Sequence, residues 1–273
     1  MSALRYRRAL TIAGSDSGGG AGIQADLKVF AALGVYGASA ITALTAQNTL
    51  GVQSIQALPA DFVRAQIHSV LGDIGADAVK IGMLERAEII EAVAEALASH
   101  PGLPIVLDPV MVAKGGAFLL RPEAVESLRR KLLPRAAVLT PNLPEAEALL
   151  GRRIESDADF EDAARDFLDL GCQAVYLKGG HREGPVVADY FRRRAGHDEG
   201  GFWLRSERVE TPNVHGTGCS LASAIAAFLA RGYDVEGAAR SAHAYLARAV
   251  TEGARYRLGA GHGPVHHFAG VWP

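Results

Sequence analysis

The chain has little cysteine, little charge and few aromatic residues. Among 273 residues it contains 2 cysteines, 21% charged residues and 7% aromatic residues. Two cysteines, Cys172 and Cys219, are too few for a disulfide framework, and we expect reduced thiols in a cytoplasmic protein. The net charge of −2, from 28 basic and 30 acidic residues, gives no electrostatic reason to expect nucleic acid or an anionic membrane as a partner.

Charge is missing altogether from one continuous stretch, residues 31–60. A stretch of this length could cross a bilayer, but glycines, glutamines, an asparagine and Pro59 interrupt it. We therefore expect two buried strands and a turn here rather than a membrane helix.

Three common catalytic motifs are also missing. The dipeptide Gly-Lys does not occur, which excludes a P-loop. The segment Gly14–Gly18 has Asp16 at its centre, where a nucleophile elbow would have serine. There is no H-E-x-x-H and no pair of C-x-x-C motifs, and we expect His266 and His267 to be surface or core histidines rather than metal ligands.

Hydrophobic residues make up 49% of the chain, enough for a large buried core. Short β-branched runs alternate with segments whose apolar residues recur at spacings of three and four, as Ile23, Leu27 and Phe30 do. This alternation predicts an α/β fold in one domain, residues 1–273, with a mostly parallel sheet covered by helices on both faces. The expected strands are Ala9–Ala13, Ala38–Thr45, Ala78–Ile81, Ile105–Leu107, Ala137–Thr140, Ala174–Leu177, Val186–Phe191 and Phe202–Val209, and the expected closing helices are Gly218–Ala230 and Val235–Glu252.

The first expected strand runs into a glycine-rich loop, Gly14–Gly22, that opens directly into a helix. Glycines let the backbone come close to a ligand, and a helix start offers N–H groups to an anion. Residues 20–25 match the dinucleotide pattern G-x-G-x-x-A, but the second strand ends at Gln47-Asn48 without the acidic residue that would hold a ribose. A nicotinamide site is therefore disfavoured, and a tight turn without a ligand stays open.

Acidic and amide residues follow two later strands. Asp108 comes directly after Ile105–Leu107, and Asn142 and Glu145 come after Ala137–Thr140. Each could serve local structure, as a turn residue, a helix cap or a partner of a helix dipole. Ligands of such sheets lie beyond the carboxyl ends of the strands, where these three residues together would suit Mg²⁺ and phosphate.

The most specific segment is His215–Ser220, which stands immediately before an apolar helical pattern. Glycines at the start of a helix leave several N–H groups pointing at one spot, which predicts an anion hole. Cys219 would lie in the first turn, where the positive end of the helix dipole favours a thiolate. The residues alone leave open whether this thiol is a nucleophile, a general base or an inert buried group.

These segments resemble the hydroxymethylpyrimidine/phosphomethylpyrimidine kinases of thiamine biosynthesis, within the ribokinase-like superfamily. The resemblance runs from end to end in family order, with small departures at Val214 and Ser220, where the family often has threonine. The matching segments are 13–26, 42–49, 80–84, 108–111, 140–146, 177–181, 215–219 and 263–267. The resemblance implies a ribokinase-like three-layer α/β/α sandwich with a mostly parallel central sheet. It also implies ATP-dependent phosphorylation of the hydroxymethyl group of 4-amino-5-hydroxymethyl-2-methylpyrimidine, followed in many members by a second phosphorylation.

The resemblance further implies roles for individual residues. The group expected at the transferring phosphate consists of Gly216, Thr217, Gly218, the base Cys219 and the cation Lys178. Nucleotide contacts are expected from Asn142, Lys178 and Thr217, and Mg²⁺ contacts from Asp108, Asn142 and Glu145. The pyrimidine pocket is expected to contain Gly14, Asp26, Gln47, Met83 and Val110.

Two further readings compete with this one. A pyridoxal-type vitamin kinase shares the Gly-Thr-Gly-Cys loop and acts on a similar hydroxymethyl-bearing ring. A non-catalytic nucleotide sensor is opposed by the presence of Cys219, Asn142 and Glu145. The resemblance also implies a cytoplasmic homodimer that binds a small pyrimidine, ATP and Mg²⁺, without a nucleic-acid or membrane partner.

Overall fold

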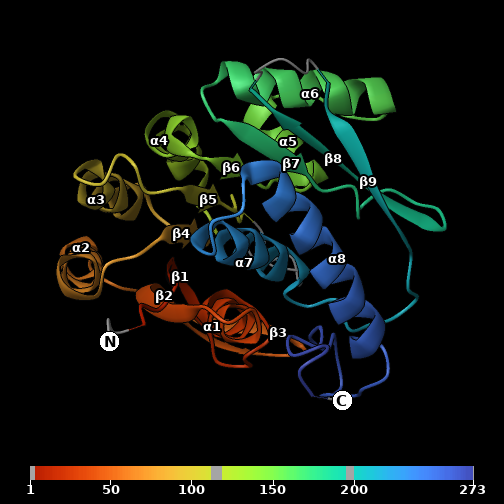
Figure 1. Cartoon of the computed structure of the whole chain (residues 1–273), viewed down its shortest axis with the longest axis horizontal. Helices are drawn as coiled ribbons and strands as arrows, with labels where there is room; N and C mark the ends of the chain where they lie inside the picture. Colours follow the sequence, from red (N-terminus) through yellow and green to blue (C-terminus); the bar gives the residue numbers. More distant parts are fainter. Residues whose placement is uncertain (1–3, 112–118, 195–199, 273) are drawn as a thin grey trace.

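A nine-stranded sheet runs through the described part of the protein, residues 4–111, 119–194 and 200–272 of the computed structural model (Figure 1). The strand order is β3-β2-β1-β4-β5-β6-β7-β8-β9. The neighbouring pairs from β2 to β7 are parallel, and the pairs that involve β3, β8 and β9 are antiparallel. The strands are β1 Arg8–Asp16, β2 Tyr36–Asn48, β3 Gly51–Ala57, β4 Ala78–Ile81, β5 Ile105–Leu107, β6 Val138–Leu139, β7 Ala174–Leu177, β8 Val186–Arg193 and β9 Phe202–Glu207.

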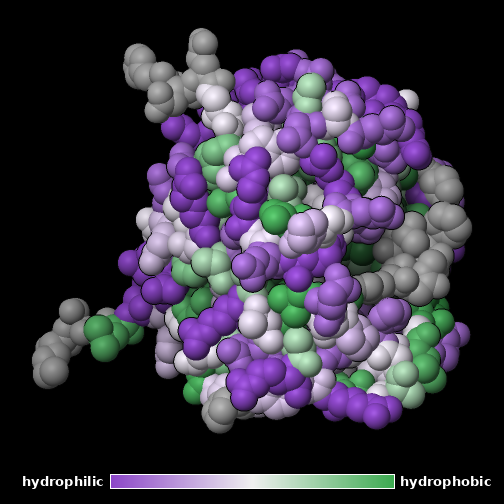
Figure 2. All heavy atoms as spheres, turned by 90° about the vertical axis from the view of Figure 1, so that its right-hand side faces the viewer, coloured by the Kyte–Doolittle hydropathy of each residue, from purple (hydrophilic) through white to green (hydrophobic). Residues whose placement is uncertain are grey.

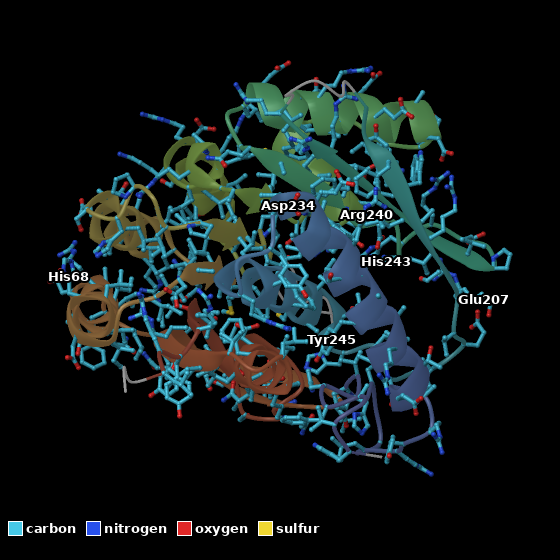
Figure 3. All side chains as sticks on the ribbon, in the orientation of Figure 1. His68, Glu207, Asp234, Arg240, His243 and Tyr245 are labelled. Atoms are coloured by element: carbon cyan, nitrogen blue, oxygen red, sulfur yellow. The ribbon has the colours of Figure 1, made fainter. Side chains whose placement is uncertain are left out.

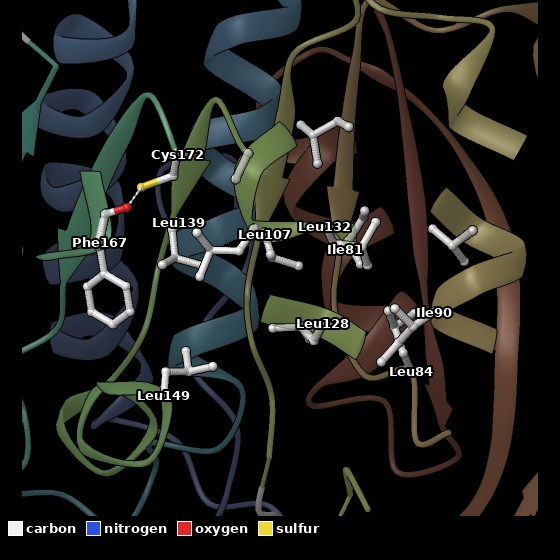
Figure 4. Packing of buried hydrophobic residues seen from close by; sticks show 14 of the residues in the cluster. Ile81, Leu84, Ile90, Leu107, Leu128, Leu132, Leu139, Leu149, Phe167 and Cys172 are labelled. Atoms are coloured by element: carbon white, nitrogen blue, oxygen red, sulfur yellow. Dashed lines mark hydrogen bonds between the residues drawn. The ribbon is translucent and has the colours of Figure 1, made fainter. Parts of the chain in front are cut away.

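Alternate residues of the central strands face opposite layers, because successive side chains of a strand point to opposite faces. In β5, Ile105 and Leu107 belong to one hydrophobic cluster, and Val106 belongs to the other. The first cluster contains buried residues of α2 to α6, and part of it is shown in Figure 4. The second contains buried residues of α1, α7 and α8. Helices thus cover both faces, which confirms the predicted three-layer α/β/α sandwich.

The helices connect the strands in the alternating order that the sequence predicts. Their bounds are α1 Gly22–Ala32, α2 Ala60–Ser69, α3 Ala87–Ala98, α4 Pro122–Lys131, α5 Leu143–Leu150, α6 Asp157–Asp169, α7 Thr217–Ala230 and α8 Val235–Gly253. Helix α7 is apolar on nearly all sides, with its residues from Ser220 to Phe228 buried. This is the pattern of a helix enclosed by other elements, here the sheet, α1 and α8.

The uncharged stretch forms β2 and β3, but the expectation that both strands are buried is wrong. Every residue of β3 is at least partly exposed, and Leu44 on β2 is 45% exposed. The two strands pair with each other antiparallel, and β3 forms the edge of the sheet. Glutamines in β3 tolerate this exposure, so the stretch has polar side chains without charge at an edge.

The surface is mainly polar on the face that Figure 2 presents, with apolar side chains in small groups. None of the helices within the described ranges is long and apolar enough to cross a membrane.

Candidate active site

The carboxyl ends of the parallel strands bring together residues that are far apart in the sequence. Asp108 follows β5, and Lys178 follows β7. Asn142 follows β6 and forms an isolated parallel bridge with Lys178, whose N–H donates to the Pro141 carbonyl at 2.9 Å. This edge of the sheet therefore holds a lysine next to the acidic and amide residues that the sequence predicts for a metal and phosphate site.

Lys178 lies between two buried carboxylates. Its Nζ donates to Asp108 Oδ1 at 2.9 Å and lies 3.8 Å from Glu145 Oε2. Thr140 Oγ1 also donates to Asp108 Oδ1, at 3.2 Å. Asp108 is 1% exposed and Glu145 is 6% exposed, so water screens these charges poorly.

The electrostatics of this cluster favour an additional positive charge. Burial, with a contribution from the nearby Asp108, raises the pKa of Glu145 to about 7 against the opposing effect of Lys178. Burial opposes the charge on Lys178, but the carboxylates of Asp108 and Glu145 outweigh it and raise the pKa of the ammonium group. One lysine is therefore insufficient to keep both carboxylates ionised at neutral pH.

Asn142 and Glu145 also form a helix cap, as the alternative interpretation of the sequence predicts. Asn142 Oδ1 accepts from the Glu145 N–H at 2.9 Å, and Glu145 Oε2 accepts from the Asn142 N–H at 2.8 Å. This reciprocal capping box fixes both side chains at the start of α5. Capping and ligand binding are compatible here, because each carbonyl or carboxylate oxygen accepts more than one hydrogen bond or metal contact.

The start of α7 lies against the same cluster. Gly216, the cap residue, has φ of 80°, and a Cβ added there would collide with the Gly20 carbonyl, so glycine is required on both counts. A Cβ added to Gly218 would lie 3.2 Å from Lys178 Nζ and 3.7 Å from Asp108 Oδ2. The first turn of a helix leaves N–H groups without intrahelical acceptors. An anion at this helix start would therefore meet backbone N–H groups and Lys178 together.

The expectation that the helix start makes Cys219 a thiolate is contradicted. Burial raises the pKa of this half-buried cysteine to about 11, Lys80 opposes the rise, and Asp26 and Asp108 add to it. The Lys80 charge and the Gly22 N–H lower the pKa, but they do not offset the loss of water around the sulfur. Cys219 is thus a neutral thiol at neutral pH, with its sulfur near the Gly22 N–H.

Beneath Cys219 lies a polar network that involves Lys80, which the sequence analysis did not select. Asp26 accepts from Thr11 Oγ1 at 2.6 Å, from Lys80 Nζ at 2.9 Å and from Ser223 Oγ at 2.6 Å. Lys80 and Asp26 are fully buried. Burial opposes the charge on Lys80, but Asp26, Cys219 and Asp108 outweigh it and raise the pKa.

The bonds of Asp26 in this network differ from its predicted role as a residue that lines the pyrimidine pocket. The carboxylate is 0% exposed and is bonded to three side chains, so in this structure it supports the site from below and does not line an open pocket. A signal for Lys80 exists in the sequence: a lysine inside the apolar strand Ala78–Ile81 needs a buried partner. Asp26 supplies it from the apolar stripe of α1.

The other expected pocket residues lie around the glycine-rich loop. A Cβ added to Gly14 would lie 3.0 Å from Met83 Sδ, so these two residues are neighbours. Gln47, at the end of β2, lies 3.3 Å from the ring of His215 through its Nε2. Val110 donates its N–H to the Asp108 carbonyl at 2.8 Å, which places it beside one of the predicted metal residues.

Metal-binding side chains do not form a closed cage here. Within the described ranges, no group of three or more histidine, cysteine, aspartate or glutamate side chains is arranged to hold a metal ion. His266 and His267 are both buried, and burial lowers the pKa of His267 to about 4. A divalent cation at Asp108 and Glu145 would therefore need further oxygen ligands, which the phosphates of a nucleotide can supply.

Comparisons with known proteins find relatives over nearly the whole chain. A family model described as phosphomethylpyrimidine kinase matches residues 16–266. The chain is 48% identical over 97% of its length to a hydroxymethylpyrimidine/phosphomethylpyrimidine kinase of Salmonella typhimurium, of which it covers 98%. It is 50% identical, with the same two coverages, to the protein of that name from Rhizobium meliloti. Among solved structures, an ADP complex of Bacillus subtilis pyridoxal kinase is 38% identical, with a TM-score of 0.89, over 98% of this chain and 100% of the other.

Proposed function

The chain belongs to the phosphomethylpyrimidine kinase family, and we infer that it transfers a phosphoryl group from ATP to the hydroxymethyl group of 4-amino-5-hydroxymethyl-2-methylpyrimidine. It is a hydroxymethylpyrimidine/phosphomethylpyrimidine kinase of thiamine biosynthesis, which phosphorylates the alcohol and then the monophosphate. The observation that carries this function is the meeting of Lys178, Asp108 and Glu145 with the start of α7 at Gly218.

The start of α7 and Lys178 are proposed to hold the transferring phosphate. Backbone N–H groups of Gly218 and Cys219 would face the phosphate oxygens, beside Thr217, whose own N–H is directed to the Val214 carbonyl at 3.4 Å, and Gly216 allows the loop to approach closely. Lys178 would offset the negative charge that spreads over those oxygens in a loose transition state. The ADP complex of the structural relative supports ATP as the phosphate donor.

Asp108, Asn142 and Glu145 are the residues that fit Mg²⁺. Two carboxylates share one lysine, and the raised pKa of Glu145 indicates that the cluster accommodates a further cation. When bound, Mg²⁺ would neutralise part of the phosphate charge and orient the phosphates. Loss of a proton from Glu145 would accompany this binding, because a nearby cation favours the carboxylate.

Gly14, Gln47, Met83 and Val110 are proposed to surround the pyrimidine. Met83 contributes an apolar surface beside Gly14, where any side chain would crowd the methionine sulfur. The Gln47 carboxamide offers both a donor and an acceptor to the ring edge. Asp26, fully buried, is proposed to act on this pocket through Lys80 and Ser223 rather than by contact.

Cys219 is proposed to accept the hydroxyl proton late in the transfer. Only the thiolate form, which has lost its own proton to solvent, can accept that proton. With a pKa near 11 the thiolate is a small fraction at neutral pH but a strong base, and proton removal comes late in a loose transition state. As phosphate and Mg²⁺ enter, the charges around the sulfur change, and Lys80 remains the fixed positive group beneath it.

Mass spectrometry of the products after incubation with hydroxymethylpyrimidine, ATP and Mg²⁺ tests this function. We expect the monophosphate to form first and the diphosphate to follow. Pyridoxal should be tested in parallel, because a structural relative of high similarity is a pyridoxal kinase. Phosphorylation of pyridoxal alone would overturn the assignment, and ATP binding without any product would favour the nucleotide sensor.

A homodimer is the proposed assembly, and light scattering after size-exclusion chromatography tests it. Exposed apolar residues near the β2–β3 edge, Leu44 and Leu50, are 45% and 71% exposed. A mass of one chain under assay conditions would contradict the dimer.

A further inference from the structure

His215 lies between the glycine-rich loop and the expected pyrimidine pocket, beside Asp16 and Gln47. Its ring Nε2 lies 2.9 Å from Asp16 Oδ2 and 3.3 Å from Gln47 Nε2. A Cβ added to Gly20 would collide with the imidazole, so the ring has little room to move away from these partners. One ring nitrogen therefore touches both a carboxylate and a carboxamide.

Asp16 determines where the imidazole proton lies. The carboxylate is 3% exposed and accepts backbone N–H groups of Gly18 at 2.8 Å, Gly20 at 3.1 Å and Ala21 at 2.8 Å. Burial raises its pKa, but the hydrogen bonds from His215 and these backbone groups outweigh burial and lower it. An ionised carboxylate can only accept, so His215 Nε2 must carry the hydrogen that it donates to Asp16.

The carboxamide of Gln47 then faces the wrong partners in its present orientation. Its Nε2, a donor, faces the Nε2–H of His215, another donor. Its Oε1 lies 3.2 Å from Thr45 Oγ1, whose single hydrogen is already directed to the Ser15 carbonyl at 2.8 Å. Rotation of the amide by a half turn removes the donor–donor conflict: Oε1 then shares the His215 Nε2–H with Asp16, at the longer of the two distances, and Nε2 donates to Thr45.

We propose that His215, held by Asp16, fixes the Gln47 carboxamide with its oxygen toward the imidazole and thereby makes this pocket selective for a 4-aminopyrimidine edge. The proposal rests on the proposed function, because it assumes that Gln47 faces the ring. His215 acts here as a positioning residue: it need not touch the substrate, and it works through the orientation of Gln47.

A fixed amide discriminates where a freely rotating amide does not. A 4-aminopyrimidine presents a donor beside a ring acceptor, whereas the 4-oxo analogue presents an acceptor beside a ring donor. The hydroxymethyl group must point toward the start of α7. This fixes the orientation of the ring, and with it the order in which the donor and acceptor on the ring edge face Gln47. An amide that could rotate would pair with either ring, and an amide held by His215 pairs with one.

The first test measures the tautomer of His215 by long-range ¹H–¹⁵N correlation in the free protein at neutral and mildly alkaline pH. We expect the proton on Nε2 of His215. A signal from the tautomer protonated only on Nδ1 would overturn the proposal, whatever the catalytic activity of the protein. This readout does not depend on the identity of the substrate.

The second test compares kcat/KM for the 4-amino ring and its 4-oxo analogue in wild type and His215→Leu. We expect the preference for the amino ring to fall by about 10- to 100-fold in the variant, the size expected for one misplaced buried hydrogen bond. The matched control is His68→Leu, which changes an exposed histidine on α2, far from this pocket (Figure 3). An unchanged preference in a folded His215→Leu protein would overturn the proposal. Failure of wild type to phosphorylate the amino ring would instead refute the proposed function.

Discussion

Two lysine–carboxylate groups lie within electrostatic reach of Cys219, and they differ in what they leave unsatisfied. The lower group, Lys80 with Asp26, is fully buried, and Asp26 also bonds Thr11 and Ser223. The upper group sets Lys178 between Asp108 and Glu145, with the lysine side chain 14% exposed. The lower group is complete without a ligand, whereas the upper group has one cation for two acids. The Lys80–Asp26 pair therefore supports the site structurally, whereas the group of Lys178, Asp108 and Glu145 can bind charge that arrives with a substrate.

The largest expected effect on stability comes from breaking the ion pair between Lys80 and Asp26. Lys80→Met leaves Asp26 as a buried charge without a countercharge, and we expect a loss of about 3–5 kcal/mol in the free energy of unfolding. Urea denaturation measures it. The double variant Lys80→Met/Asp26→Leu removes both charges and should recover much of the loss. A Lys80→Met protein as stable as wild type would show that this pair has no structural role.

Removing Lys178 should lower turnover more than stability, the reverse of what is expected for Lys80. Lys178→Met should lower kcat by about 10²- to 10³-fold, because it removes positive charge where negative charge develops. Its stability should change much less than that of Lys80→Met, since Glu145 already binds a proton readily. Steady-state kinetics and denaturation on the same preparations separate the two lysines. Equal losses of stability in Lys80→Met and Lys178→Met would contradict the proposed difference between the two groups.

Cys219, which lies between the two groups, should react slowly as a thiol. With a pKa of about 11, its alkylation by iodoacetamide at pH 7 should be slower than that of a free cysteine, and should accelerate up to about pH 11. Modification should inactivate the enzyme, and bound substrates should protect it. Cys172 is the internal control, because it is fully buried and burial raises its pKa to about 12. Rapid alkylation at pH 7 would mean that Cys219 is ionised.

Cys219→Ala should still fold and bind both substrates, with turnover reduced by about 10²-fold. Cys219→Asp should recover part of the activity by placing a carboxylate beside the helix start. Full turnover in Cys219→Ala would leave catalysis to the helix start, Lys178 and the metal.

The fold was predictable because its signals are local and repeated. Apolar strands such as Ala78–Ile81 alternate with helices of clear periodicity, and the end of each parallel strand is marked by a polar residue or a glycine. The exposure of β3 was not predictable, because an uncharged segment is compatible both with the edge of a sheet and with a buried core.

The sequence predicts that Asp108 and Lys178 lie at the carboxyl ends of strands, but it does not predict the electrostatics of the candidate site. The helix start at Cys219 suggested a thiolate, whereas the pKa depends on burial and on Lys80, which comes from a distant strand. The contacts of His215 with Asp16 and Gln47 join the segment before α7 to the ends of β1 and β2, and no spacing in the sequence records them.

A smaller effect concerns the stability of the upper group. The raised pKa of Glu145 means that the folded protein binds more protons than the unfolded chain between about pH 4.5 and 7, so stability falls as pH rises through this range. Glu145→Gln removes that cost. We expect the variant to be more stable than wild type by on the order of 1–3 kcal/mol at pH 8, equal to it near pH 4.5, and slower in turnover. Thermal unfolding at the two pH values checks the sign, and equal stability at pH 8 would contradict it.

Calorimetry of MgATP binding at pH 7 in buffers of different ionisation enthalpy tests most directly whether the upper group accepts the incoming charge. Because burial raises the pKa of Glu145 to about 7 in the free protein, part of the Glu145 population is protonated at pH 7, and binding should release protons. Glu145→Gln should release none. Binding of MgATP to wild type without proton release, or the same release from Glu145→Gln, would contradict the account.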